Sequence, residues 1–477
     1  RFVDSTINPY GSSVYLRSRN LNLFVMDNWR VRSNLTVNYG VRYEYTGPSF
    51  EKYDRMVSLD ANSDFSRLAQ VFPGQTGPVS GRRYSRSIVN ADRNNFAPRI
   101  GIAWKPKAGS PFVFRVGYGI SYNPGAVASA ANQLINQSPF AVTQTLATDR
   151  KNPLTLAVGF PENPDLTILN TFAVDPDYAP SYAQQWTLDI QTQLSRLYVL
   201  NVSYMGSKGN GLDMVRAPKG NASASSFLYL TNSASSIYHG LNVQLSRRFS
   251  HGFNMRNSYT FSKSIDNALG SGGAAVAQND DDLDAERALS SQDQRHNFQT
   301  SFMYELPFGQ NRAFFAGAST KIQNLISGWT FNGTWTVASG NPLTARYTSS
   351  RGNASGAALY NSLRADATGL PVSLPRSART AQRFFNTAAF AIPAGQYGTS
   401  GRNTITGPGS SVVNVSMRKS VRLDESNRRL DISWQIQNLL NHPNWAGVST
   451  TVNALNFGQV TSVRAMRSMT MDLRIRF

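Results

Sequence analysis

The stretch LNLFVMDNWRV, residues 21–31, followed after three residues by LTVNYGVRYEY, residues 35–45, decides the fold. Successive side chains of a β-strand point to opposite faces, so strict alternation predicts strands with one apolar and one polar face. The three residues between the two segments are short enough for a hairpin turn. The apolar positions are Leu21, Leu23, Val25, Trp29 and Val31, then Leu35, Val37, Tyr39, Val41, Tyr43 and Tyr45.

The same hairpin pattern returns four more times, in residues 96–104 with 112–122, 186–194 with 198–204, 241–249 with 253–261, and 413–423 with 430–436. Two further strands, 298–306 and 329–337, are joined by a stretch in which residues 320–326 fit a short helix. A last alternating segment ends at Phe477. Together these patterns predict roughly 13 strands.

The connections between strands alternate between short polar links and long segments. The long ones are residues 46–95, 123–182, 207–236, 263–294, 340–410 and 441–466. Loops of this length are uncommon in a compact domain but typical of outer-membrane barrels, which have tight turns at one end and long loops at the other. No segment approaches the roughly 18 consecutive apolar residues of a membrane-spanning helix. We therefore expect an all-β, transmembrane antiparallel β-barrel of the outer-membrane type, in which residues 1–477 form one domain.

The formal charge of +19 and the pI near 10.2 would ordinarily suggest nucleic acid. Nine of the 47 basic residues are Lys, which leaves 47 − 9 = 38 Arg, and they are dispersed without an aromatic-rich basic stripe. We therefore expect no nucleic-acid partner. Several arginines occupy the polar positions of strands and are predicted to face the lumen, where they can pair with carboxylates or an anionic solute. They are Arg30, Arg42, Arg99, Arg115 and Arg256.

Three charged residues occupy positions on the apolar faces of their strands: Asp27, Arg247 and Lys419. All three are placed toward the short-turn end. A charge on the lipid face costs only about 0 to 1 kcal/mol near the membrane boundary, against roughly 2 to 4 for a basic residue at the midplane. These exceptions are therefore compatible with a membrane barrel.

Motifs for catalysis or metal binding are sparse. Asp280, Asp281, Asp282, Asp284 and Glu286 form a dense acidic cluster whose oxygens could hold Ca²⁺, but the spacing is not that of an EF-hand, and we favour a solvated loop or pairing with arginines. There is no cysteine, so neither a disulfide nor a thiolate metal site is expected. Residues 206–209 and 407–409 are glycine-rich but lack the phosphate-loop pattern and are predicted to be turns. Four scattered histidines and no nucleophile elbow lead us to expect no enzymatic activity and no cofactor.

Several motifs give the chain a family resemblance: FVMDNW at 24–29, PRIGIAW at 98–104, YMGSKG at 204–209, YTFSKSID at 259–266, LPFG at 306–309, SGNP at 339–342 and NLLNHP at 438–443. In this order they resemble the barrel of TonB-dependent outer-membrane receptors of the Oar-like subgroup. The chain departs from that pattern at Met26, where the family more often has a polar residue.

The resemblance implies a barrel of on the order of 22 strands closed by a plug, which transports a scarce solute with energy from the TonB complex. The terminal Phe477 resembles the signal read by the barrel-assembly machinery. We expect the plug, the TonB-binding segment and about nine strands to precede Arg1. Two alternatives remain: a structural or adhesive surface protein that is anchored by the barrel and contacts other surface proteins, and a passive porin. Outer-membrane lipid is a partner in all three cases. The solute cannot be identified, because fold does not determine cargo.

Overall fold

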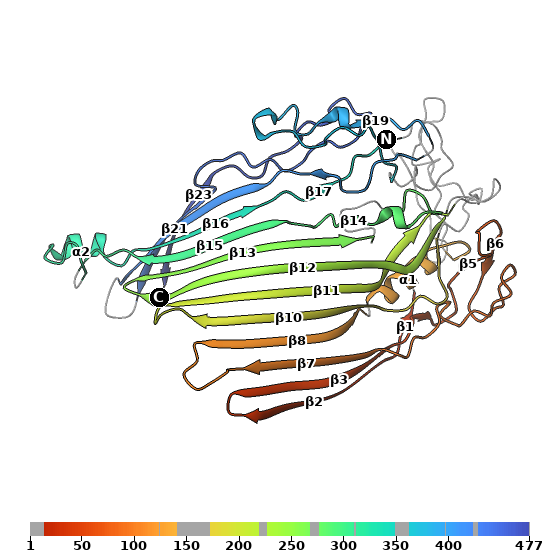
Figure 1. Ribbon diagram of the computed structural model, residues 1–477, viewed down its shortest axis with the longest axis horizontal. Helices are drawn as coiled ribbons and strands as arrows, with labels where there is room; N and C mark the ends of the chain where they lie inside the picture. Colours follow the sequence, from red (N-terminus) through yellow and green to blue (C-terminus); the bar gives the residue numbers. More distant parts are fainter. Residues whose placement is uncertain are drawn as a thin grey trace.

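A computed structural model describes residues 14–123, 125–140, 172–218, 227–267, 276–309, 312–348, 362–395, 397–422 and 428–476. Its main feature is a curved antiparallel sheet in which thirteen described strands follow one another as neighbours (Figure 1). In spatial order they are β2 (Asn20–Arg32), β3 (Leu35–Thr46), β7 (Phe96–Trp104), β8 (Phe112–Asn123), β10 (Ser181–Gln193), β11 (Tyr198–Arg216), β12 (Leu228–Ser250), β13 (Phe253–Asp266), β15 (His296–Glu305), β16 (Thr330–Ala338), β21 (Ser410–Arg422), β22 (Arg429–Gln437) and β23 (Ser468–Arg476).

This order confirms the hairpins predicted from the alternating pattern. The turn between β12 and β13 illustrates how the sequence closes them: His251 and Gly252 both have positive φ, 50° and 75°. A two-residue turn with left-handed φ at both positions matches the twist of the flanking strands, and glycine adopts it without steric cost. Between β15 and β16 the structure places α2 (Thr320–Ile326), the helix that the sequence predicts.

The pairing register keeps the apolar positions of all these strands on one face. One row across six strands is formed by Ile102, Val116, Leu188, Tyr204, Leu241 and Phe261, each paired with the next. Many side chains of this face are exposed: Val25 is 67%, Met471 66% and Leu473 64% accessible. A continuous exposed apolar surface of this extent needs an apolar partner, and lipid supplies one on every strand.

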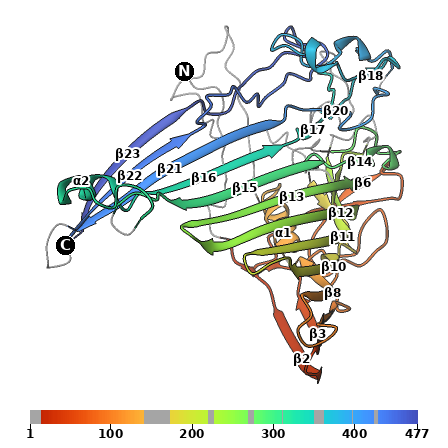
Figure 2. The ribbon, with the colours of Figure 1, turned by 60° about the vertical axis from the view of Figure 1, so that its left-hand side comes forward.

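The two ends of the sheet differ. The short turns and α2 lie at one end, and the long connections gather at the other, where they carry most of the small elements (Figures 1 and 2). These are β1 (Leu16–Arg17), β4 (Phe50–Glu51), β5 (Ser58–Ala61), β6 (Leu68–Val71), α1 (Gly125–Ile135), β9 (Phe172–Val174), β14 (Ala288–Leu289), β17 (Pro342–Leu343), β18 (Asp366–Ala367), β19 (Phe390–Ala391) and β20 (Ile405–Thr406), with 3₁₀ turns at Asp284–Glu286, Arg376–Ala378 and Thr387–Ala389.

The long connections form hydrophobic cores of their own. One core joins Met56 and Ile88 of the β3–β7 connection to Leu134 of α1 and to Tyr178 of the β8–β10 connection. A second core is built from the β16–β21 connection, with buried Phe384, Phe385, Phe390 and Ile405, and residues 445–460 of the β22–β23 connection pack against it. The long-loop end is therefore a packed structure, although no periodic pattern in the sequence predicts it.

The expectation that residues 207–236 form a loop is wrong in part. β11 continues to Arg216 and β12 begins at Leu228, and the two stay paired past the predicted ends, with register shifts around Leu212. Alternation marks a strand only where its two faces meet different media. Beyond the apolar band both faces meet water or other loops, so these strands extend without an alternating sequence.

Among the described residues no helix has the length and apolarity needed to cross a membrane.

Candidate functional site

The five arginines predicted to face the lumen share one face of the sheet, opposite the apolar band. Arg99 pairs with Gly40 and Gly119, and Arg42 is two residues from Gly40, so both side chains point the same way. Arg115 pairs with Asp189, and the same row continues through Ser203 and Asn242. Arg30, paired with Thr36, and Arg256, paired with Ser246, fall on this polar face as well.

Some of these arginines are satisfied within the sheet and others are not. Arg42 forms an ion pair with Glu44 at 2.8 Å, and Arg115 donates to Asp189 at 2.8 Å and to Gln191 at 3.0 Å. Arg99 and Arg256 form neither a hydrogen bond nor an ion pair with any residue that the structure describes. The polar face therefore presents cationic groups that are available to an occupant.

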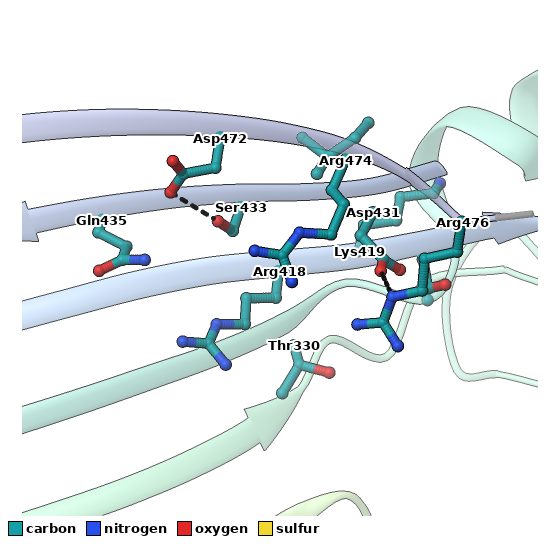
Figure 3. Close-up of a pocket in the computed structure, with 12 residues that line it drawn as sticks. Thr330, Arg418, Lys419, Asp431, Ser433, Gln435, Asp472, Arg474 and Arg476 are labelled. Carbon is teal, nitrogen blue, oxygen red and sulfur yellow. Dashed lines mark hydrogen bonds and ion pairs between the residues drawn. The ribbon is translucent and has the colours of Figure 1, made fainter. Parts of the chain in front are cut away.

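A further group of arginines on the polar face lies near the C-terminal end of the sheet. There Arg418 of β21 and Arg474 and Arg476 of β23 border an open hollow of about 560 Å³, together with Asp431 and Asp472 (Figure 3). The alternating pattern of β21 and β23 contains these arginines too, so the reasoning that selected Arg99 would have found them.

Only part of the charge in this hollow is paired. Arg476 Nε is 2.6 Å from Asp431, and Asp472 accepts a hydrogen bond from Ser433 at 3.2 Å. In Figure 3 the guanidinium groups of Arg418 and Arg474 extend over the hollow, and neither has a partner among the described residues. Two unpaired guanidinium groups that line one hollow can bind a carboxylate or phosphate, which they contact through several N–H donors.

Two members of the acidic cluster pair with arginines from other parts of the chain. Asp280 receives two hydrogen bonds from Arg216, from Nε at 2.9 Å and from Nη2 at 2.8 Å. Glu286 is fully buried, and both of its carboxylate oxygens accept from Arg364. Asp281, Asp282 and Asp284 are exposed. In the described part of the chain no group of three or more acidic or histidine side chains is placed to hold a metal ion.

Two buried carboxylates hold the β3–β7 connection together. Asp60 accepts from the backbone N–H groups of Val79 and Ser80 and from the hydroxyl of Tyr84. Burial raises the pKa of this carboxyl, but the hydrogen bonds outweigh burial and hold the pKa below its usual value. Glu51 accepts from the N–H groups of Tyr15, Tyr53 and Arg55, and its pKa is lowered in the same way against the effect of burial.

The charged residues on the apolar face each have a local partner. Asp27 accepts a hydrogen bond from the Tyr39 hydroxyl at 3.0 Å. Arg247 donates to the backbone carbonyls of the β12–β13 turn, and Lys419 Nζ donates to the carbonyl of Leu325 at 2.8 Å. For Arg247 and Lys419 these partners lie at the short-turn end, as the sequence predicts, and they satisfy basic groups that lipid cannot. Asp27 lies near the middle of β2, five residues before its end at Arg32, so its predicted place toward the short-turn end is wrong.

The glycine motif at 407–409 has a structural part in the long-loop end. A Cβ atom on Gly340 would lie 1.8 Å from the carbonyl oxygen of Gly407, so the two backbones touch where β17 pairs with β20. Glycine is required for this approach. The other glycine motif, residues 206–209, lies within β11, so the predicted turn is wrong there. Phe477, the predicted assembly signal, lies outside the described residues.

Comparison with known proteins is consistent with this geometry. Residues 2–470 match the family described as "Outer membrane beta barrel domain". A comparison with functionally characterised proteins gives no significant sequence match.

Among solved structures, the chain is similar to the outer membrane transporter YddB from Escherichia coli, with 10% identity and a TM-score of 0.50 over 96% of this chain and 54% of that one. It is also similar to FpvA from Pseudomonas aeruginosa in a complex with pyoverdine, with 9% identity and a TM-score of 0.47 over 96% of this chain and 38% of that one. For the ferric-catecholate import receptor Fiu from Escherichia coli K12 the identity is 12% and the TM-score 0.43, over 96% of this chain and 44% of that one. The chain thus spans about half the length of the first of these proteins.

The family match covers nearly the whole sequence, and it agrees with a sheet that has one apolar and one polar face. The chain belongs to the outer membrane β-barrel domain family, and its place is the bacterial outer membrane.

Proposed function

We propose that this chain is the C-terminal part of the barrel of a TonB-dependent receptor of the Oar-like subgroup, which imports a scarce solute. In this proposal the packed long loops face the outside and, with the upper lumen, bind the solute. A plug and a TonB-binding segment precede Arg1, and about nine further strands complete a barrel of on the order of 22.

The observation that carries the proposal is the set of unpaired arginines on the polar face. Arg99, Arg256, Arg418 and Arg474 have no partner among the described residues. An unpaired guanidinium group forms strong charge-assisted hydrogen bonds with a carboxylate or phosphate, and in a plugged transporter both the plug and the solute can supply such a group. The motifs between residues 24 and 443, which occur in the same order as in the receptor family that they resemble, support the same proposal.

The alternative is a structural or adhesive surface protein that uses the barrel as an anchor. The packed loop end supports it to some degree, since the core around Phe384, Phe385 and Phe390 gives the outer surface a defined shape. A barrel that serves only as an anchor has less need of unpaired cations in its lumen, which is why we favour transport.

The test is deletion of the complete gene, followed by measurement of solute-limited growth and of attachment to surfaces or other cells. Transport predicts loss of growth on one scarce solute, with uptake abolished by a protonophore, since TonB-driven import depends on the energised inner membrane. Unchanged uptake together with lost attachment would refute the transport proposal and support the alternative.

A further inference from the structure

The connection between β15 and β16, residues 312–328, exposes apolar side chains where a polar surface is expected. Phe314 is 55%, Phe315 62%, Ile322 49% and Leu325 72% accessible. Ile322 and Leu325 are three positions apart on α2, so they lie on one side of the helix. This connection is at the short-turn end, away from the packed loops (Figure 1).

One polar side chain of α2, that of Gln323, is turned toward the preceding turn. Gln323 Nε2 donates to the carbonyls of Phe315 at 2.8 Å and of Ala316 at 3.1 Å, and so ties the preceding turn to α2. Both phenylalanines also lie against Phe308, with ring centroids about 6 Å apart. A surface helix in water buries its apolar side and exposes its polar side. In α2 the apolar Ile322 and Leu325 are exposed together with Lys321, whereas Gln323 is turned inward.

The far end of α2 is fastened to the apolar face of the sheet. The carbonyl of Leu325 accepts from Lys419 Nζ at 2.8 Å and from Trp329 Nε1 at 3.0 Å. Lys419 is paired with Ile432, which is paired with Leu473. One more apolar row, Val421 with Leu430 and Ile475, lies still nearer the short-turn end. The helix therefore joins the sheet within the apolar band rather than beyond it.

We propose that the β15–β16 connection is a membrane-binding element that inserts Phe314, Phe315, Ile322 and Leu325 into the boundary of the lipid leaflet at the short-turn end. The occupant of this surface is lipid, because the surface is continuous with the band that faces lipid on β16, β21 and β23. Aromatic and aliphatic side chains are stable at the level of the headgroups, with an amphipathic helix lying in the plane of the membrane. Lys419 and Trp329 position the helix at that depth.

Nitroxide labels on the intact protein in phosphatidylethanolamine–phosphatidylglycerol vesicles test the proposal. The 477-residue sequence has no cysteine, so Leu325→Cys and Ile322→Cys each give it a single labelling site. Leu473→Cys, on the apolar band, serves as the lipid control, and Leu370→Cys, 52% accessible in the β16–β21 connection, as the water control. The measurement is the collision rate of each label with oxygen, which partitions into lipid, and with a water-soluble nickel chelate.

The expected ratio of oxygen to nickel collisions at positions 325 and 322 is severalfold above that at position 370 and approaches that at position 473. A ratio equal to that at position 370 overturns the proposal, because it places the helix in water. Low collision rates with both oxygen and the nickel chelate, rising when the protein is diluted, would also overturn the proposal. Such a result would identify a second copy of the chain as the occupant. Lys419→Met is expected to increase the motion of the label at position 325, and an unchanged spectrum would show that Lys419 does not position the helix.

Discussion

Arg364 and Glu286 form a buried ion pair that joins two long connections: Arg364 Nη1 is 2.8 Å and 2.9 Å from the two carboxylate oxygens. Their side chains are 6% and 1% exposed. Arg402 approaches the same carboxylate at 3.9 Å and also pairs with Asp266 of β13. The β13–β15 and β16–β21 connections are thus fixed to each other and to the end of the barrel wall.

The first prediction concerns this pair. Glu286→Gln leaves the buried Arg364 without its countercharge, whereas Arg402 keeps Asp266. Loss of one partner of a buried pair typically costs about 3 to 5 kcal/mol. We expect the long-loop end to open locally, with faster hydrogen exchange and proteolysis in residues 362–395, while the strands stay protected. The matched control is Arg312→Ala, which breaks the exposed Arg312–Glu305 pair at 3.0 Å and is expected to change stability by less than about 1 kcal/mol. Equal effects of the two variants would contradict the assigned role.

The second prediction concerns pH. The pKa values of Asp60 and Glu51 are lowered in the folded protein, from ordinary values of 3.8 and 4.5. A carboxyl whose pKa is lowered by folding contributes its full stabilisation at any pH above its ordinary pKa. This stabilisation is lost as the pH falls toward the pKa of the folded state. Residues 49–95 are therefore expected to become susceptible to an acid-active protease below about pH 4 while resisting it at pH 6. Asp60→Asn should remove part of this pH dependence, and an unchanged profile would show that Asp60 does not cause it.

The third prediction concerns glycines on the barrel wall. A Cβ atom on Gly206 would lie 2.2 to 2.4 Å from the indole ring of Trp186, its neighbour across the strands. Gly206→Val must displace this ring, and overpacking of this kind costs about 1 to 3 kcal/mol. We expect a lower midpoint of unfolding in urea. The fraction of folded protein is measured from the mobility shift of the folded barrel in electrophoresis. Gly101→Ala is the control, because its nearest new contact is 4.0 Å away at Asn38. A similar loss in both variants would contradict the packing argument.

The fourth prediction concerns the hollow beside β23. Arg418, Arg474 and Arg476 face Asp431 and Asp472 there, which leaves an excess of positive charge. A cysteine introduced at Ser433 should react faster with an anionic thiol reagent than with a cationic one of the same size, and the preference should weaken at high salt. Lys419 also lines the hollow, so Arg418→Gln together with Arg474→Gln leaves two cations against two carboxylates, and the preference should be lost. Equal rates for the two reagents would show that the hollow does not select anions.

The alternating segments predict the membrane-spanning part of this chain well, and the reason is physical. Lipid on one side and a polar interior on the other force a period of two on each strand, as in residues 35–45. The same constraint identified Arg42, Arg99 and Arg115 as members of one polar face. The further expectations of a plug and of nine preceding strands concern chain beyond the described residues and remain predictions.

The long-loop end could not be predicted, because nothing there imposes a period. Met56, Leu134 and Tyr178 meet in one core although they are far apart in the sequence. The pairing of Glu286 with Arg364 spans 78 residues. Such contacts depend on the path of irregular backbone, and the sequence showed only that Glu286 belonged to an acidic cluster. The extended ends of β11 and β12 were missed for the same reason.

Single-cysteine scanning of residues 98–104 in the intact protein in lipid vesicles tests the central claim, that the apolar face meets lipid and the arginine-bearing face meets the lumen. Labels at positions 100 and 102 should collide with oxygen dissolved in lipid, and labels at 99, 101 and 103 should not, which gives a period of two along β7. The opposite phase, with position 99 in lipid, or no alternation at all, would contradict the account.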